Sequence, residues 1–378
     1  MIIKIDKEGN LAKLEMMLSE LLADSSVKSI MMLACDENFF TPYIVDPLLS
    51  RLNKPVFGGI FPQILTESET LTKGTILAGL TCEVSLFVIK NISHPLTNID
   101  QQMEIPFSGK PVINKTNFLF VDGMSTSIAK LLESSFNHFG LKSNYIGGGA
   151  GSMSFKPTPC IITPEGILQD AAIFAFADMT SGVGVAHGWS PISGALKVTE
   201  ACDNKVISLD WKPALEVYRD IVVKESGSAG FPFDFDKLAK KYPIGIVKMA
   251  DELLVRDPVK TEDQSLVCLG ELPLNSFVFV LNGDSASLLE GARRSRSLAE
   301  SVFSSRKVSP NLSSTSVTFF IDCITRALFL GDQFNEELHI ASGGGKLIGA
   351  LSLGEIANSG SDYLEFYNKT SVVGIVAD

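Results

Sequence analysis

Continuous and periodic apolar stretches along the chain predict strands that alternate with amphipathic helices. Apolar residues at helical spacing predict a first helix over residues 10–25. A strand follows at Ser29–Leu33, and then a helical stretch around Tyr43–Leu52. Two further apolar runs, Thr75–Leu80 and Cys82–Ile89, predict a hairpin. The first part of the chain therefore indicates a strand, a helix, a second strand and a hairpin.

The same order of elements recurs further along the chain. Asn117–Val121 is a second strand-like run, and Thr126–Phe139 has helical spacing. A glycine-rich segment, Gly147–Gly151, follows and marks a place where a backbone or a ligand approaches closely. A hairpin formed by Cys160–Ile162 and Ala171–Phe176 is predicted next. We interpret the second series as a repeat of the first.

Residues 317–377 read as a third copy of this series. The three copies have similar spacings from the end of the first strand to a glycine in the next: 23 residues (Cys35 to Gly58), 24 (Gly123 to Gly147) and 26 (Cys323 to Gly349). A fourth, partial copy is predicted from a strand at Phe277–Leu281 and a helix from Ala286 to about Phe303. Self-similarity of this length indicates a repeated supersecondary unit.

This repeat predicts an α/β fold with mixed sheets flanked by helices. The strand–helix–strand step favours a parallel pair with a right-handed crossover, while each hairpin adds antiparallel strands. The segment Ser226–Pro232 is the best linker in the chain, because it is rich in turn-forming residues. We therefore predict two domains, residues 1–225 and residues 226–378.

Composition and charge narrow the possible functions. With 378 residues and 45% hydrophobic content the chain can bury a sizeable core, and its net charge of −11 argues against a nucleic acid or an anionic membrane as partner. No run reaches the roughly 18 apolar residues of a membrane span, and the first residues do not form a secretory signal. The six cysteines form no C-x-x-C pair. We expect free thiols and a cytoplasmic protein.

Several short motifs, taken in order, resemble the FIST family, in which an N-terminal and a C-terminal FIST domain occur in tandem. The resemblance extends from about residue 28 to residue 376 and is fairly specific through the order and spacing of its motifs. The stretches that carry it are Gly147–Ser152, His187–Ile192, Leu209–Tyr218, Tyr242–Ile246, Leu254–Arg256, Asp322–Arg326, Gly354–Ile356 and Asn368–Thr370.

The resemblance implies a sensory, ligand-binding protein of signal transduction that binds small polar molecules such as amino acids. Some relatives are haem-binding nitric oxide sensors that act on histidine kinases, and others are joined to an F-box. No kinase, cyclase or F-box pattern is visible in this sequence. The protein would therefore signal by contacting a partner such as a histidine kinase.

A candidate ligand site comprises Cys323, Arg326, Gly354, Glu355 and Asn368. Arg326 would anchor a ligand carboxylate, Glu355 would hold its amine, Asn368 would donate or accept beside them, and Cys323 would line the pocket. The alternative is a structural Arg326–Glu355 pair, because buried charge is costly unless it is paired. A helix that starts at Cys323 would lower the pKa of its thiol.

Two other functions remain as alternatives. Cys323 could serve as the nucleophile of a thiol-dependent hydrolase, but no base is placed beside it in the sequence, so we predict no enzyme activity. His187 lies among apolar residues beside Trp189 and could be an axial ligand of haem, although hydrogen-bonded packing is the more ordinary role of such a histidine. No other cofactor and no metal site are predicted.

Overall fold

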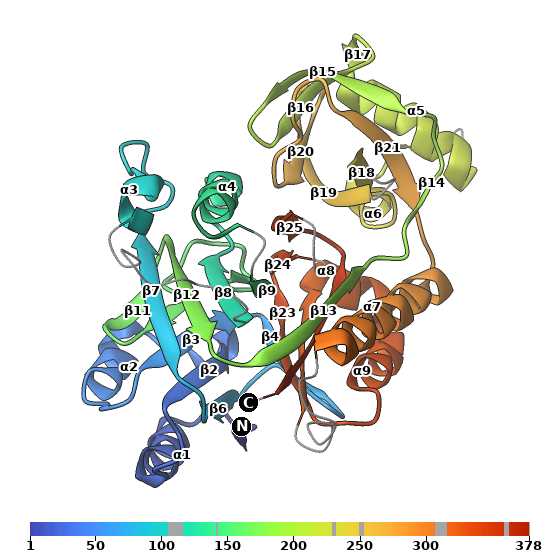
Figure 1. The fold of residues 1–378 in the computed structure, drawn as a ribbon. Coiled ribbons are helices and arrows are strands. Elements are labelled where there is room, and N and C mark those ends of the chain that lie inside the picture. Colours follow the sequence, from blue (N-terminus) through green and yellow to red (C-terminus); the bar gives the residue numbers. More distant parts are fainter. Residues whose placement is uncertain are drawn as a thin grey trace.

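The computed structural model describes residues 1–104, 116–140, 143–228, 232–248, 253–306, 316–358 and 363–377. Its elements form three six-stranded sheets and a separate group of strands between β13 and α7 (Figure 1). The fold is α/β with mixed sheets flanked by helices, as predicted.

Each of the three sheets is built around one copy of a repeating unit. The first unit comprises β1 (Ile2–Asp6), α1 (Leu11–Ala23), β2 (Ser29–Cys35), η1 (Asp36–Asn38), α2 (Pro42–Leu49), β3 (Val56–Phe61), β4 (Gln63–Thr66), β5 (Thr70–Leu71) and β6 (Thr75–Leu80). The second comprises β7 (Val84–Lys90), α3 (Ile99–Glu104), β8 (Thr116–Asp122), α4 (Ile128–Phe139), β9 (Asn144–Ala150), β10 (Ile161–Thr163), β11 (Gly166–Leu168) and β12 (Ala171–Ala177). The third comprises β13 (Thr180–Ala186), α7 (Ser285–Arg306), β22 (Val317–Cys323), α8 (Ile324–Leu330), η4 (Gly331–Gln333), α9 (Phe334–Ser342), β23 (Leu347–Ser352), β24 (Glu355–Ala357), β25 (Glu365–Tyr367) and β26 (Ser371–Ala377).

Every unit has the same three-stranded centre. A wholly buried strand (β2, β8 or β22) pairs in parallel with the strand after the helix (β3, β9 or β23). Its other side pairs antiparallel with the last strand of the unit (β6, β12 or β26). Continuous apolar sequence suits these central strands, because both faces of each sheet are covered.

The predicted repeat glycines occupy one equivalent position in the three units. A Cβ added to Gly58, Gly147 or Gly349 would lie 1.8 Å from the carbonyl oxygen of the facing residue on the parallel partner strand. Only glycine allows the two backbones to approach so closely. The predicted strand–helix–glycine-strand unit is therefore confirmed.

The units exchange their short hairpins in a cyclic way. The hairpin β4–β5 of the first unit extends the sheet of the third, β10–β11 extends the sheet of the first, and β24–β25 extends the sheet of the second. The strand that begins each unit pairs with β6, β12 or β26 at the opposite edge. The core of the protein is thus a pseudo-threefold assembly of interlocked units.

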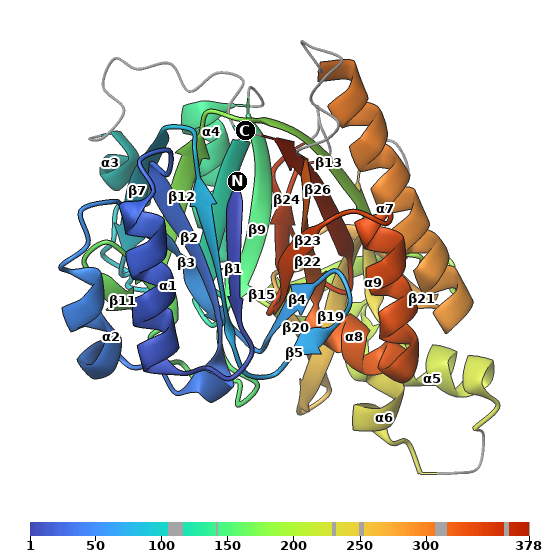
Figure 2. The same ribbon diagram turned by 90° about the horizontal axis from the view of Figure 1, so that it is seen from below.

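The inner faces of the three sheets meet in a common hydrophobic core. Phe118 of the second unit has its ring 6.2 Å from that of Phe57 in the first unit and 5.2 Å from that of Phe319 in the third. Figure 2 shows the strands gathered in the middle, with α1 and α2 on one side and α7 and α9 on the other. The helices cover the outer faces. In α1, for example, a stripe that includes Leu14 and Leu18 is buried and Asn10 caps the N-terminus.

Three details of the predicted pairing are wrong. The runs Thr75–Leu80 and Cys82–Ile89 do not form a hairpin, because β6 and β7 belong to different sheets. Likewise, the strand at Ala171–Phe176 pairs with β7 and β8 rather than with the strand at Cys160–Ile162, whose partners are β11 and β3. The predicted fourth copy is wrong too, since Phe277–Leu281 lies outside the three units and the helix after it belongs to the third. Periodicity identifies a strand but does not identify its partner.

The segment between β13 and α7 forms an antiparallel barrel. Its elements are β14 (Ser190–Pro191), β15 (Leu196–Cys202), β16 (Lys205–Leu209), β17 (Lys212–Pro213), α5 (Ala214–Ser226), α6 (Phe235–Ala239), β18 (Ile244–Val247), β19 (Leu253–Glu262), β20 (Ser265–Leu269) and β21 (Phe277–Asn282). Six of the strands close a ring in the order β18, β21, β15, β16, β20 and β19, because β18 pairs with both β21 and β19. The division predicted at residue 226 falls at the last residue of α5, and the two-domain organisation stays a prediction.

Candidate functional site

A group of buried ionisable residues lies at the carboxyl end of the parallel pair β22–β23. We call it the Arg326 cluster, and it comprises Asp322, Cys323, Arg326, Glu337 and Glu355, all at most 1% exposed. The first two end β22, Arg326 lies in the first turn of α8, Glu337 is on α9 and Glu355 begins β24. Ligands of open α/β sheets commonly bind at this end of the strands.

The guanidinium of Arg326 is held entirely by protein groups. Its Nε and Nη2 donate to Glu337 Oε1 at 2.9 and 2.7 Å, and Nε lies 3.6 Å from Asp322 Oδ1. Nη1 also donates to the carbonyl oxygen of His187, and Nη2 to that of Leu288. Burial alone would lower the pKa of Arg326, but Glu337 and Asp322 raise it above the usual value. The residue therefore remains charged, with its direct carboxylate partner on α9.

Asp322 and Glu337 share this one guanidinium. Burial raises the pKa of Asp322 well above its usual value, and the negative charge of Glu337 raises it further. Burial also raises the pKa of Glu337, although Arg326 opposes that shift. Asp322 Oδ2 and Glu337 Oε2 are both buried without a hydrogen-bond partner in the described part of the chain. A proton shared by the two carboxyl groups would relieve both the repulsion and the missing bond.

Glu355 lies in the same cluster but has its own partners. Its Oε1 accepts from Ser352 Oγ at 2.9 Å, and its Oε2 accepts from the backbone N–H of Thr370 at 3.2 Å. Burial raises its pKa to about 8 against these bonds and against the charge of Arg326, which favours ionisation. The expected proximity of Arg326 and Glu355 is thus electrostatic, and no hydrogen bond joins them within the described residues. Glu355 can gain or lose its proton near neutral pH.

Cys323 is the N-cap of α8, one residue before the helix begins, and its thiol is not activated. Its Sγ lies 3.2 Å from Thr325 Oγ1 in a fully buried setting. Burial, together with the negative charge of Glu355, raises the pKa of the thiol. The expected lowering by the helix N-terminus is wrong for this environment, because the loss of hydration outweighs the helix dipole.

The turn Asn368–Thr370 connects the cluster to the barrel. Lys369 is fully buried and its Nζ lies 3.2 Å from Asp257 Oδ2 of β19 and 5.6 Å from the ring centroid of Trp189. Trp189 Nε1 donates to the Lys369 carbonyl oxygen at 3.1 Å. Asn368 donates to the Tyr367 carbonyl oxygen at 2.9 Å, while its own side-chain oxygen is buried without a partner among the described residues. The barrel therefore covers this end of the sheet with polar contacts.

Gly354 has a packing role that the sequence did not reveal. Its φ is +105°, and an added Cβ would lie 2.2 Å from the ring of Phe366. Its carbonyl oxygen accepts from the backbone N–H of Gly149 at 2.7 Å. The room beside this glycine is therefore occupied by an aromatic ring and by the glycine-rich strand β9, which confirms that Gly147–Gly151 receives a closely approaching backbone.

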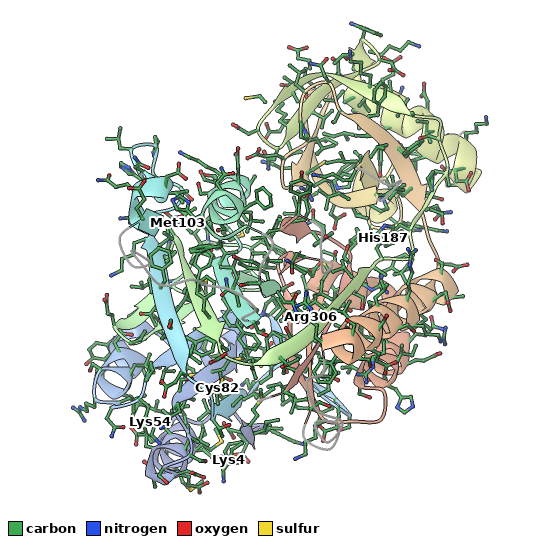
Figure 3. The ribbon with its side chains drawn as sticks, in the orientation of Figure 1. Lys4, Lys54, Cys82, Met103, His187 and Arg306 are labelled. Atoms are coloured by element: carbon green, nitrogen blue, oxygen red, sulfur yellow. The ribbon has the colours of Figure 1, made fainter. Side chains whose placement is uncertain are left out.

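His187 does not fit the requirements of a haem ligand. It lies where the chain leaves β13 for the barrel (Figure 3). Its Nδ1 accepts from the backbone N–H of Trp189 at 2.9 Å, and the ring also hydrogen-bonds the backbone of Leu253. Burial and the nearby charge of Arg326 lower its pKa to about 4. Both sides of this neutral ring are engaged by backbone groups, which leaves no free nitrogen for an iron.

Three further findings concern metal ions, disulfides and membrane spans. The described residues contain no group of three or more His, Cys, Asp or Glu side chains arranged to hold a metal ion. None of the six cysteines, all of which lie within the described residues, is joined in a disulfide. Among the described helices, none is long and apolar enough to cross a membrane.

The structure brings Cys323, Arg326 and Glu355 into one cluster, with Asn368 on the adjoining turn, and it adds members that the sequence interpretation missed. Glu337 is the most important of these, because it is the direct partner of Arg326. A sequence signal existed: Phe334, Glu337, Leu338 and Ala341 share one face of α9, so the carboxylate falls on the buried stripe. Lys369 and Asp257 lie far apart in sequence, and no local pattern could have paired them.

The chain thus folds as a pseudo-threefold α/β core with an inserted barrel and a buried ionic cluster. Two family models match successive parts of the chain. The FIST N domain matches residues 29–212, and the FIST C domain matches residues 214–358. The chain belongs to the FIST family. FIST domains are associated with signal transduction and the sensing of small ligands. No curated protein matches the chain significantly.

Proposed function

We propose that this protein is an intracellular sensory protein that binds a small polar molecule, such as an amino acid, at the Arg326 cluster. The observation that carries the proposal is a buried carboxyl group, Glu355, together with a buried acceptor that lacks a donor among the described residues, the side-chain oxygen of Asn368. Glu355 is poised to ionise near neutral pH, and the side-chain oxygen of Asn368 has no donor in the described part of the chain. An unpaired buried acceptor costs roughly 1–3 kcal/mol. A ligand ammonium would supply donors to both groups.

The roles of the site residues are refined by their contacts. Arg326 is saturated by Glu337 and by backbone carbonyl groups, so we assign it a positioning role beside the ligand carboxylate rather than a free anchor. Glu355 would pair with the ligand amine, with Cys323 lining the same space. Since these groups are fully buried, the ligand would enter when the barrel moves away from the turn at Asn368–Thr370. Ligand binding would thereby be coupled to the position of the barrel.

The downstream step would be contact with a signalling protein such as a histidine kinase. The barrel is the part of the molecule whose position would report ligand binding, because Arg256 and Asp257 on β19 contact the turn region directly. We propose no catalytic step. A hydrolase mechanism at Cys323 would need a thiolate, and burial disfavours it.

A thermal-shift screen against free amino acids, their N-acetyl derivatives and their amides would test the proposal. A ligand that binds only the folded protein raises the free energy of unfolding by RT ln(1 + [L]/Kd), and the melting temperature rises with it. We expect at least one free amino acid to stabilise the protein, its N-acetyl derivative to lose the effect, and Glu355→Gln to abolish the difference. Glu365→Gln, a partly exposed carboxylate on the same hairpin that pairs with Lys248, is the matched control. A screen without any stabilising amino acid would refute this assignment.

A further inference from the structure

A second site lies at the equivalent strand end of the first unit. A pocket of about 300 Å³ is located where β2 and β3 end, and we call it the Asp36 pocket. Its lining is Asp36, Glu37, Phe39, Phe40, Thr41, Pro42, Ile60, Ser152, Thr158 and Pro159. Half of these residues are apolar, and the two carboxylates belong to η1. The volume is at the lower end of the range of small-molecule sites, about 300–1,000 Å³.

Two turns build the pocket, and one carboxylate connects them. The backbone N–H of Phe39 donates to the Asp36 carbonyl oxygen, and that of Phe155 donates to the Ser152 carbonyl oxygen, both at 3.0 Å. Asp36 Oδ2 accepts from the backbone N–H of Met153 at 2.9 Å, which ties the second turn to the first. Asp36 therefore holds the pocket together with one oxygen only.

The other oxygen of Asp36 has no hydrogen-bond donor in the described part of the chain. Asp36 Oδ1 is shielded from solvent and has no hydrogen-bond partner within the described residues. Neither Asp36 nor Glu37 forms an ion pair in the described part of the chain. A buried carboxylate oxygen without a donor is costly, and a cation would remove that cost.

The backbone keeps an aromatic ring exposed at the rim. Phe39 is 72% exposed and has φ of +54°, a left-handed conformation that is unfavourable for a bulky residue. Strained residues of this kind are found preferentially at functional sites. A phenyl face beside a carboxylate is the combination that recognises organic cations.

We propose that the Asp36 pocket binds a small organic cation: a protonated amine carried on an apolar body of about one ring. The ammonium would pair with Asp36 Oδ1, while the apolar body would contact Phe40, Ile60 and Pro159. The site is independent of the proposed function, because it lies in a different unit and shares no residue with the Arg326 cluster. Free anions are excluded by the two uncompensated carboxylates.

Three probes of similar shape but different charge distinguish recognition of the cation from binding of the apolar body alone. Phenethylamine, 2-phenylethanol and 3-phenylpropionate are titrated into the full-length protein, and dissociation constants are measured by ligand-observed NMR. We expect the amine to bind at least about tenfold more tightly than the alcohol, because a hydrogen bond to a charged group is worth roughly 1.5 kcal/mol or more. The anion should bind most weakly. Equal affinity for amine and alcohol in the wild-type protein would overturn the proposal without any variant.

Variants then locate the site. Asp36→Asn keeps an oxygen for the Met153 N–H but removes the charge, so the amine-to-alcohol ratio should fall to about one. Glu67→Gln, an exposed carboxylate in the β4–β5 turn, should leave the ratio unchanged. Glu355→Gln should also leave it unchanged, which keeps this result separate from the test of the Arg326 cluster. Retention of the preference for the amine in Asp36→Asn would refute the proposed site.

Discussion

The strand ends of the first and third units share a backbone design but differ in what occupies them. Both follow a buried central strand and its parallel partner, and both have an aspartate where that strand ends. In the third unit Asp322 is fully buried among paired charges, and the barrel covers it. In the first unit Asp36 lines an open pocket that has one exposed aromatic residue, Phe39. The comparison shows that the same strand-end geometry can carry an open pocket or a closed ionic cluster, and that the inserted barrel covers the latter.

The largest expected effect concerns the closed strand end. Arg326→Ala would leave Asp322 and Glu337 buried without their cation, which should lower the free energy of unfolding by about 3–5 kcal/mol. Urea denaturation followed by circular dichroism measures this change. Arg293→Ala is the control, because its ion pair with Glu336 is half exposed and should contribute less than about 1 kcal/mol. Similar losses in the two variants would show that the Arg326 cluster is not a stabilising element of the apo protein.

The second prediction uses the proton held by Glu355. Its pKa is about 8 in the folded protein against 4.5 ordinarily, so between these values the native state binds more protons than the unfolded state. Stability should therefore fall as pH rises from about 4.5 to 8, by at most about 1.4 kcal/mol per pH unit for one proton. Glu355→Gln should remove this slope. Denaturation curves of the two proteins at pH 5.5, 6.5 and 7.5 check it, and parallel pH profiles would contradict it.

Part of the fold and part of the candidate site could be predicted from the sequence. The equivalence of Gly58, Gly147 and Gly349 was predictable, because it depends on spacing within each unit. The exchanged hairpins were not, since β4 and β24 have the same local pattern whichever sheet receives them. The Arg326 cluster was found in part, from charged residues in apolar surroundings. Its dominant pair involves Glu337, which was overlooked, and its link to the barrel involves Lys369 and Asp257, which meet only through the tertiary fold.

A third prediction tests whether the units are equivalent in energy as well as in shape. Gly349→Ala, Gly58→Ala and Gly147→Ala would each force a methyl group against a carbonyl oxygen of the partner strand. Each should destabilise the protein by about 1–3 kcal/mol or more, as overpacking does. Gly345→Ala is the control, because the nearest atom to its Cβ would be 3.5 Å away. If thermal denaturation shows a loss of stability for a substitution in only one unit, the three units do not contribute equally to the stability of the core.

The smallest effect is expected at the open strand end, and it has the opposite sign. Phe39→Gly relieves a left-handed backbone that costs about 1–2 kcal/mol, although the freer unfolded chain offsets roughly 0.5–1 kcal/mol of it. The net result should be a stabilisation of a few tenths of a kcal/mol up to about 1 kcal/mol. Phe155→Gly, with φ of +51° and outside the pocket lining, should stabilise to the same extent. Only Phe39→Gly should also weaken the binding of phenethylamine, so equal weakening by both would mean that Phe39 has no specific contact with the cation.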